Sequence, residues 1–335
     1  MTMQERNRTG KIIGYGIVLL ILTCVTSACI GSYPLSVWDI LRVITGNAAG
    51  EMGEKVFWLL RLPRVVTGVA AGAALGICGA VFQLLFDNPL AAPDLVGVAG
   101  GAGMGAACAI VLGTGSVQSV ICGAFVGGMA ALGGVFLLVW ISGSNRPGMF
   151  ILGGILISSL TNAGIMILKH AADSEGKLAA IEFWTMGSLA SVTVSKMTGV
   201  LCVCVPGLIL LILLQKEILL LSLGDEQARM LGLSPGKMRI ILLTVATLCV
   251  AAVISVTGVI SFVGLLAPHG AFLLLQRRNR SFLVLSAVVG AVLVVAADCF
   301  ARSVSEGELP VSILTTLCAV PFLFFFIWKR KGRVL

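Results

Sequence analysis

The chain has 335 residues, of which 58% are hydrophobic and only 11% are charged, and its mean hydropathy is +1.06. Soluble domains carry about 25% charged residues, so a soluble enzyme is excluded, and so is a soluble domain on a membrane anchor. Charge-free stretches of the roughly 20 residues needed to cross a hydrocarbon core recur along the chain. The composition therefore predicts an all-α integral membrane protein.

The charge-free runs predict ten membrane-spanning helices, the first retained and not a cleaved signal peptide because nine others follow it. The run from Ile240 to Leu275 has 36 residues and would measure about 54 Å as one helix, so it is expected to form two helices with a hinge at Thr257-Gly258. The expected spans are residues 12–31, 65–86, 94–113, 118–140, 148–168, 197–214, 239–257, 258–275, 281–301 and 310–328.

Small residues are abundant inside these spans. The 41 glycines among 335 residues are a larger share than the roughly 7% glycine of an average protein. Small residues at four-residue spacing let helices approach closely in lipid. The ten cysteines have no Cys-x-x-Cys pair and no neighbouring histidines, which favours packing over a metal or redox role. The four-residue spacing occurs in Gly68, Gly72 and Gly76 and again in Gly97, Gly101 and Gly105.

The basic residues give an orientation. With the N-terminus in the cytoplasm, 15 of the 23 Lys and Arg residues fall on the cytoplasmic side, and the C-terminus lies there too. The net charge of +8 is therefore a topology signal and does not indicate nucleic-acid binding. The outer segments hold most of the acids: Asp39, Glu51, Glu54, Asp173, Glu175, Glu182, Glu306 and Glu308.

The outer segment 32–64 ends in Arg61-Leu62-Pro63-Arg64 directly before the second span. Proline suits the first turn of a helix, which would place both guanidinium groups at the outer membrane surface. The residues alone leave interfacial snorkelling and docking of a partner equally open.

The cytoplasmic segment between Lys216 and Arg239 is long enough to hold structure. Residues 224–232 predict a short helix, with acids in its first turn and Gly232 as its stop, and Ser234-Pro235 is expected to begin the next span. Ala228, Met230 and Leu231 have no domain of their own to pack against. An exposed apolar surface of this kind indicates partner docking.

Ionisable residues inside the spans are functional candidates by default. Asp298 and Arg302 are four residues apart on the ninth span, a spacing that suits an ion pair within one helix. His269 follows Pro268 on the eighth span. For both Asp298 and His269 a structural role is favoured. No Gly-Lys pair continues into a P-loop, and no zinc helix or aspartyl dyad is present in the sequence. We therefore expect no catalytic residue, no metal site and no ATP binding by this chain.

Several motifs together resemble the FecCD-type permease family of iron-siderophore, haem and cobalamin ABC importers. They run in the family's order over about residues 60–325. The motifs are Arg61-Leu62-Pro63-Arg64, Gly79-Ala80-Val81-Phe82-Gln83, Asn88-Pro89-Leu90-Ala91, Pro93-Asp94-Leu95-Val96-Gly97, Trp184-Thr185-Met186-Gly187-Ser188-Leu189, Gly224-Asp225-Glu226-Gln227-Ala228, Phe262-Val263-Gly264-Leu265, Pro268-His269, Asp298 with Arg302, and Glu308-Leu309-Pro310-Val311.

The resemblance implies a type II ABC importer permease fold, in which spans 2–5 and 7–10 are inverted repeats. It implies one transmembrane permease domain over residues 1–335, with a cytoplasmic coupling-helix loop at residues 217–238 that contacts an ATPase subunit. ATP and Mg would sit on that partner. The residues implied for coupling are Gly224, Asp225, Glu226, Ala228, Arg229, Leu231 and Gly232.

The resemblance also implies that Arg61, Arg64 and Arg302 receive acidic groups of an extracytoplasmic binding protein, and Arg302 alternatively serves Asp298. A second permease subunit, either a copy of the chain or a paralogue, would complete the pathway in the bacterial cytoplasmic membrane. Weakly polar side chains of the fifth span are its expected lining: Ser158, Ser159, Thr161 and Asn162.

The function expected from these residues and the resemblance is ATP-driven import of an iron chelate, with a siderophore ahead of haem and cobalamin. The spans lack charges that would coordinate a bare metal, which favours a chelate carried whole. Two other classes stay open on the residues. One is an ion-coupled secondary transporter using Asp298 or His269, and the other is a membrane-embedded enzyme.

Overall fold

The computed structural model describes residues 3–31, 33–46, 50–172, 176–304 and 308–330. Within these residues it is helical, with no strand. The membrane-scale helices are α1 (Met3–Cys29), α4 (Leu62–Leu85), α5 (Val98–Val111), α6 (Val117–Ser142), α7 (Pro147–Ala171), α9 (Val194–Leu213), α12 (Pro235–Thr257), α13 (Val263–Leu275), α14 (Arg280–Val304) and α15 (Val311–Arg330). The short elements are α2 (Val37–Ile44), α3 (Glu51–Val56), the π-helix η1 (Phe57–Arg61), the 3-10 helix η2 (Pro93–Val96), α8 (Lys177–Thr185), α10 (Gln215–Leu221) and α11 (Asp225–Met230).

Each of the ten expected spans falls on one of the long helices, and the all-α fold is confirmed. In the described part of the chain, seven helices are long and apolar enough to cross a membrane, whereas α5, α13 and α15 are shorter apolar helices. The third span begins later than expected because Gly97, at φ +78°, separates η2 from α5. The count of ten complete crossings therefore stays a prediction.

The expected hinge lies where the long uncharged run breaks. Helix α12 ends at Thr257, and Gly258 follows with φ +69°. A side chain at Gly258 would also overlap the backbone carbonyl of Trp184, so glycine is required there both by its backbone conformation and by the close approach. The chain then turns through residues 259–262 before α13 begins.

Close backbone contacts hold α4 in the middle of the bundle, where it packs on α14, α13, α12 and α9. A Cβ on Gly72 would overlap the carbonyl of Gly290 on α14, and a Cβ on Gly79 would overlap the carbonyl of Gly264 on α13. In the same way Gly105 on α5 lies against Gly123 on α6. These contacts agree with the close-packing role predicted for glycine.

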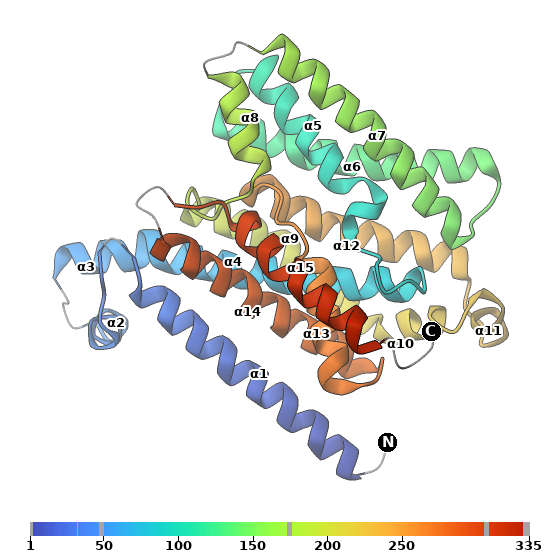
Figure 1. Ribbon diagram of the computed structural model, residues 1–335, viewed down its shortest axis with the longest axis horizontal. Helices are drawn as coiled ribbons and strands as arrows, with labels where there is room; N and C mark the ends of the chain where they lie inside the picture. Colours follow the sequence, from blue (N-terminus) through green and yellow to red (C-terminus); the bar gives the residue numbers. More distant parts are fainter. Residues whose placement is uncertain (1–2, 32, 47–49, 173–175, 305–307, 331–335) are drawn as a thin grey trace.

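Figure 1 shows a bundle with two ends. Helices α2 and α3 lie at one end, whereas α10, α11, the first turns of α1 and the last turns of α15 lie toward the other, and α5 to α8 form a group set apart from α1, α4 and α14. Helix α1 runs along α14, and Gly16 allows the approach because a Cβ there would lie 3.1 Å from Val288. The α2 end corresponds to the segment predicted to be outside.

Helix α2 has a complete capping box outside the spans. The Asp39 backbone N–H donates to the Ser36 hydroxyl oxygen, and the Ser36 hydroxyl donates to the Asp39 carboxylate at 2.6 Å. The Ser36 backbone N–H also donates to the Asp39 carboxylate at 3.0 Å, which completes the capping box. The two hydrogen bonds from Ser36 to the carboxylate stabilise its charged form and lower the pKa of Asp39 below its ordinary value. Among the acids predicted outside, Asp173, Glu175 and Glu306 lie beyond the described residues, as do Lys331 and Arg333 among the basic ones.

Candidate functional site

An arginine–carboxylate cluster lies at the α2 end of the bundle. Arg64, in the first turn of α4, donates to Asp298 on α14 through Nε at 3.0 Å and Nη2 at 2.8 Å. Its Nη1 and Nη2 also donate to the two carboxylate oxygens of Glu308, each at 2.9 Å. Asp298 is 2% exposed and Glu308 is 36% exposed, so Glu308 is the solvent-facing side of this cluster.

The other two predicted docking arginines tie α1 and the segment after it to the same cluster. Arg302 lies 3.3 Å from the Asp298 carboxylate and donates to the Ser27 hydroxyl at 2.6 Å. Arg61 donates to the backbone carbonyls of Ile30 and Tyr33. A cavity of about 760 Å³ opens beside the three arginines and Glu308.

The contacts show what this cluster can do. Each guanidinium group already has acceptors within the chain, so an acidic group on a partner would have to compete for it. The predicted Asp298–Arg302 pair is present, but Arg64 makes the closer contacts to Asp298. Sequence reasoning did not connect Arg64 with Glu308, because 244 residues separate them and no local pattern links them.

The predicted coupling helix is α11, which begins after Gly224 at φ +102° and is followed by Gly232 at φ +82°. Met230 is 85% exposed and Leu231 is 61% exposed. Ala228 is fully buried, which corrects the expectation that it is exposed with them. Glu226 and Arg229 are exposed on the same helix.

Arg239 fixes the position of α11 against the rest of the bundle. It lies on the first turns of α12, is 1% exposed, and donates to the Asp225 carboxylate at 2.7 Å and to the Asn145 carbonyl at 2.9 Å. Its guanidinium also lies 6.0 Å from the ring centre of Phe150 on α7. The sequence assigned Arg239 only to the basic cytoplasmic side, whereas the structure makes it the link between α11, α12 and α7.

The pathway candidates lie on α7 but do not share one environment. Ser159 and Asn162 are exposed, Ser158 is half-buried, and Thr161 is buried. Thr161 faces α5, since a Cβ on Gly100 would come within 2.6 Å of its hydroxyl. Of the four candidates, Ser159 and Asn162 are therefore the two that lie open on the surface of α7.

His269 is enclosed in the bundle at 3% exposure. Its Nδ1 lies 2.7 Å from the Leu265 carbonyl oxygen, so the Nδ1–H tautomer donates to it, and Gln83 approaches the same nitrogen at 3.5 Å. These contacts suit a structural role. In the described residues no group of three or more His, Cys, Asp and Glu side chains is arranged to hold a metal ion.

The fold matches that of a solved transporter. A structure titled as an inward-facing conformation of a metal-chelate type ABC transporter superposes with a TM-score of 0.87 at 32% identity, covering 96% of this chain and 99% of that one. The fold class is therefore that of a type II ABC importer permease. A family model described as the FecCD transport family matches residues 19–329, and the chain belongs to this family.

Curated relatives extend over nearly the whole chain. The hemin transport system permease protein HmuU of Yersinia pestis is 32% identical, with 99% of each chain covered. The molybdate import system permease protein MolB of Haemophilus influenzae is 33% identical, with 94% of each covered. The chain is thus a multi-pass membrane permease subunit of an ABC importer and not an enzyme, and this assignment favours ATP-driven import over an ion-coupled secondary transporter.

Proposed function

We propose that this permease imports an iron chelate as an intact molecule across the bacterial cytoplasmic membrane, with a ferric siderophore as the first substrate to test and haem or cobalamin as alternatives. The observation that carries the proposal is the close structural similarity to a metal-chelate type transporter over almost the full length. The relative named for hemin transport supports the same substrate class.

The exposed face of α7 suits such a cargo. Ser159 and Asn162 lie among the exposed apolar side chains of Ile155, Leu156 and Leu160. A hydroxyl and a carboxamide can exchange hydrogen bonds with the periphery of a chelate without competing for its metal. The proposed pathway lies between this face and a second permease subunit, which is a copy of this chain or a paralogue.

The proposed partners occupy opposite ends of the bundle. A binding protein docks at the α2 end, where its carboxylates replace Glu308 on Arg64, and the ATPase subunits bind Met230 and Leu231 of α11. ATP and Mg belong to those ATPase subunits. The termini and α11 are cytoplasmic in this arrangement, in accordance with the excess of basic residues on that side.

Transport by reconstituted protein tests the proposal. Proteoliposomes holding the permease, its ATPase and the loaded binding protein are supplied with ATP, and uptake of a ⁵⁵Fe-labelled ferric siderophore is compared with uptake of haem, cobalamin and molybdate. We expect ATP-dependent uptake of a chelate that survives collapse of the proton gradient, and a several-fold slower rate for Asn162→Leu than for the matched α7 control Met166→Leu. Uptake driven by the proton gradient alone would contradict the proposal.

Molybdate is the second candidate, because the relative named for molybdate import is as similar as the one named for hemin. A tetrahedral oxyanion needs hydrogen-bond donors and positive charge along its route. Preferential uptake of molybdate over every chelate would assign the chain to this substrate.

A further inference from the structure

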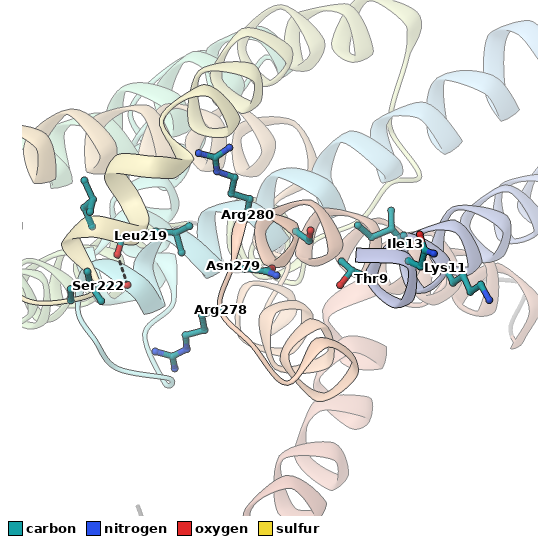
Figure 2. Close-up of a pocket in the computed structure, with 13 residues that line it drawn as sticks. Thr9, Lys11, Ile13, Leu219, Ser222, Arg278, Asn279 and Arg280 are labelled. Atoms are coloured by element: carbon teal, nitrogen blue, oxygen red, sulfur yellow. Dashed lines mark hydrogen bonds between the residues drawn. The ribbon is translucent and has the colours of Figure 1, made fainter. Parts of the chain in front are cut away.

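A second cavity lies at the opposite end of the bundle from the arginine–carboxylate cluster. Its volume is about 1250 Å³, and its walls come from the start of α1, from α10, and from the segment that joins α13 to α14 (Figure 2). It involves neither α7 nor α11. Nothing in the proposed transport cycle uses it.

The charge of this cavity has one sign. Among the residues whose side chains the structure describes, its lining includes Lys11, Arg278 and Arg280 and no acidic residue. Arg278 lies 3.6 Å from the exposed carboxylate of Asp87, whereas within the described chain neither Lys11 nor Arg280 forms an ion pair. In Figure 2, Arg280 extends toward α10, Arg278 extends to the opposite side, and Lys11 points outward from α1.

Asn279 lies between the two arginines in Figure 2, directly before the first residue of α14. Its side-chain oxygen Oδ1 is buried and has no hydrogen-bond partner among the described residues. Buried polar atoms are nearly always paired, so an unpaired acceptor in a cavity wall points to a missing donor from a bound molecule. The first backbone N–H groups of a helix also attract anions.

Part of the remaining lining is apolar and lies at the level where the membrane begins, beside the polar residues Asn7, Thr9, Ser222 and Ser281. Ile13, Leu219 and Leu220 line the same cavity, and the apolar spans of α1 and α14 start at Asn7 and Arg280. A ligand that fits must therefore be anionic at one end and apolar at the other. Free phosphate would leave the apolar wall uncovered, and a cation would meet only positive charge.

We propose that this cavity binds an anionic phospholipid of the α11-side leaflet, with the phosphate on Arg280 and within the positive field of Arg278 and Lys11, a headgroup hydroxyl donating to Asn279, and the acyl chains against Ile13 and the leucines of α10. Basic pockets between membrane helices have the charge complementarity that such headgroups require. The lipid would hold α1, α10 and α14 together at their ends. This proposal goes beyond transport of the chelate and does not depend on which substrate is carried.

Native mass spectrometry of the full-length permease, titrated in detergent with phosphatidylglycerol or phosphatidylcholine, tests it. We expect phosphatidylglycerol to bind at least tenfold more tightly than phosphatidylcholine. Arg278→Gln combined with Arg280→Gln is expected to weaken phosphatidylglycerol binding by roughly thirtyfold, because each basic residue near an anionic surface contributes about 1 kcal/mol.

Matched variants make the outcome decisive. Arg146→Gln with Lys237→Gln removes the same charge from two exposed residues of a separate cavity beside α11 and is expected to leave binding unchanged. Arg280→Gln alone serves where loss of the Arg278–Asp87 pair impairs folding, and Arg278→Lys with Arg280→Lys is expected to retain most of the affinity. An equal loss of phosphatidylglycerol affinity in the pocket variant and in the control variant would overturn the proposal. Displacement of the lipid by excess glycerol phosphate would also overturn it, and so would release of the lipid when the ATPase binds.

Discussion

At the scale of single residues, Asp298 is the acceptor on which the arginine cluster depends. It is 2% exposed and compensates both Arg64 and Arg302. Removing one partner of a buried ion pair leaves uncompensated charge and costs about 3 kcal/mol or more. We expect Asp298→Asn to lower the free energy of unfolding by about that amount, measured by denaturant titration in detergent.

The matched control for this prediction is Glu308→Gln, because Glu308 contacts the same Arg64 but is partly exposed. Ion pairs open to solvent contribute about 1 kcal/mol or less. The control should therefore unfold close to wild type. Equal destabilisation by the two substitutions would show that burial does not set the strength of these pairs.

Glu308→Gln should have a second effect if a binding protein docks at this end. Glu308 accepts two hydrogen bonds from Arg64 through its carboxylate oxygens, and an incoming carboxylate must break them. Neutralising Glu308 weakens that competitor, so we expect the binding protein to bind several-fold more tightly in a surface-plasmon or fluorescence titration. Glu54→Gln, which removes an acid of α3 at the same end, is the charge-matched control. If both variants bound the binding protein equally more tightly, the effect would come from the overall charge and not from the Arg64–Glu308 contact.

At the scale of helices, the contact between α4 and α14 depends on Gly72. A Cβ there would overlap the backbone of Gly290 and Ala291, which cannot move aside as a flexible side chain can. Overpacking of this kind costs about 1–3 kcal/mol. We expect Gly72→Ala to lower the thermal unfolding midpoint, while Gly133→Ala on α6, where a Cβ meets nothing within 4 Å, should not.

Helix α11 carries the contact expected for the ATPase. Met230 projects into solvent at 85% exposure, and an acid in its place would have to be desolvated in the interface. Met230→Asp should reduce the amount of ATPase retained on affinity-tagged permease at least tenfold. Met52→Asp on α3, an exposed methionine at the opposite end, should retain it fully, and loss in both variants would contradict a specific contact.

The helices were more predictable from the sequence than their contacts. Uncharged runs locate the helices because hydrocarbon without water excludes charge. Gly224, Gly232 and Gly258 adopt positive φ angles next to helix ends, so these three boundaries lie at the expected residues. The exposure of Ala228 was predicted wrongly because one turn of helix has two faces and the sequence did not say which one packs. The pairs Arg64–Glu308 and Arg239–Asp225 join separate segments, so only the folded chain reveals them.

At the scale of the whole molecule, the orientation can be tested by labelling. In a variant whose exposed native cysteines Cys122, Cys202 and Cys318 are replaced by serine, single cysteines are introduced at Met52 or Met230. A membrane-impermeant maleimide should label Met52→Cys in intact cells and Met230→Cys only after permeabilisation. The reverse pattern would invert the orientation and exchange the two proposed docking ends.

The short lengths of α5 and α13 have a consequence for the barrier that the closed protein presents. With 14 and 13 residues they span about 21 and 20 Å, whereas the hydrocarbon core is about 30 Å thick. Both pack against longer helices: α5 contacts α6 and α7, and α13 contacts α4 and α14. Neither helix alone is therefore long enough to insulate the bundle across the whole hydrocarbon core, so the electrical barrier at these two positions is shared with the neighbouring helices.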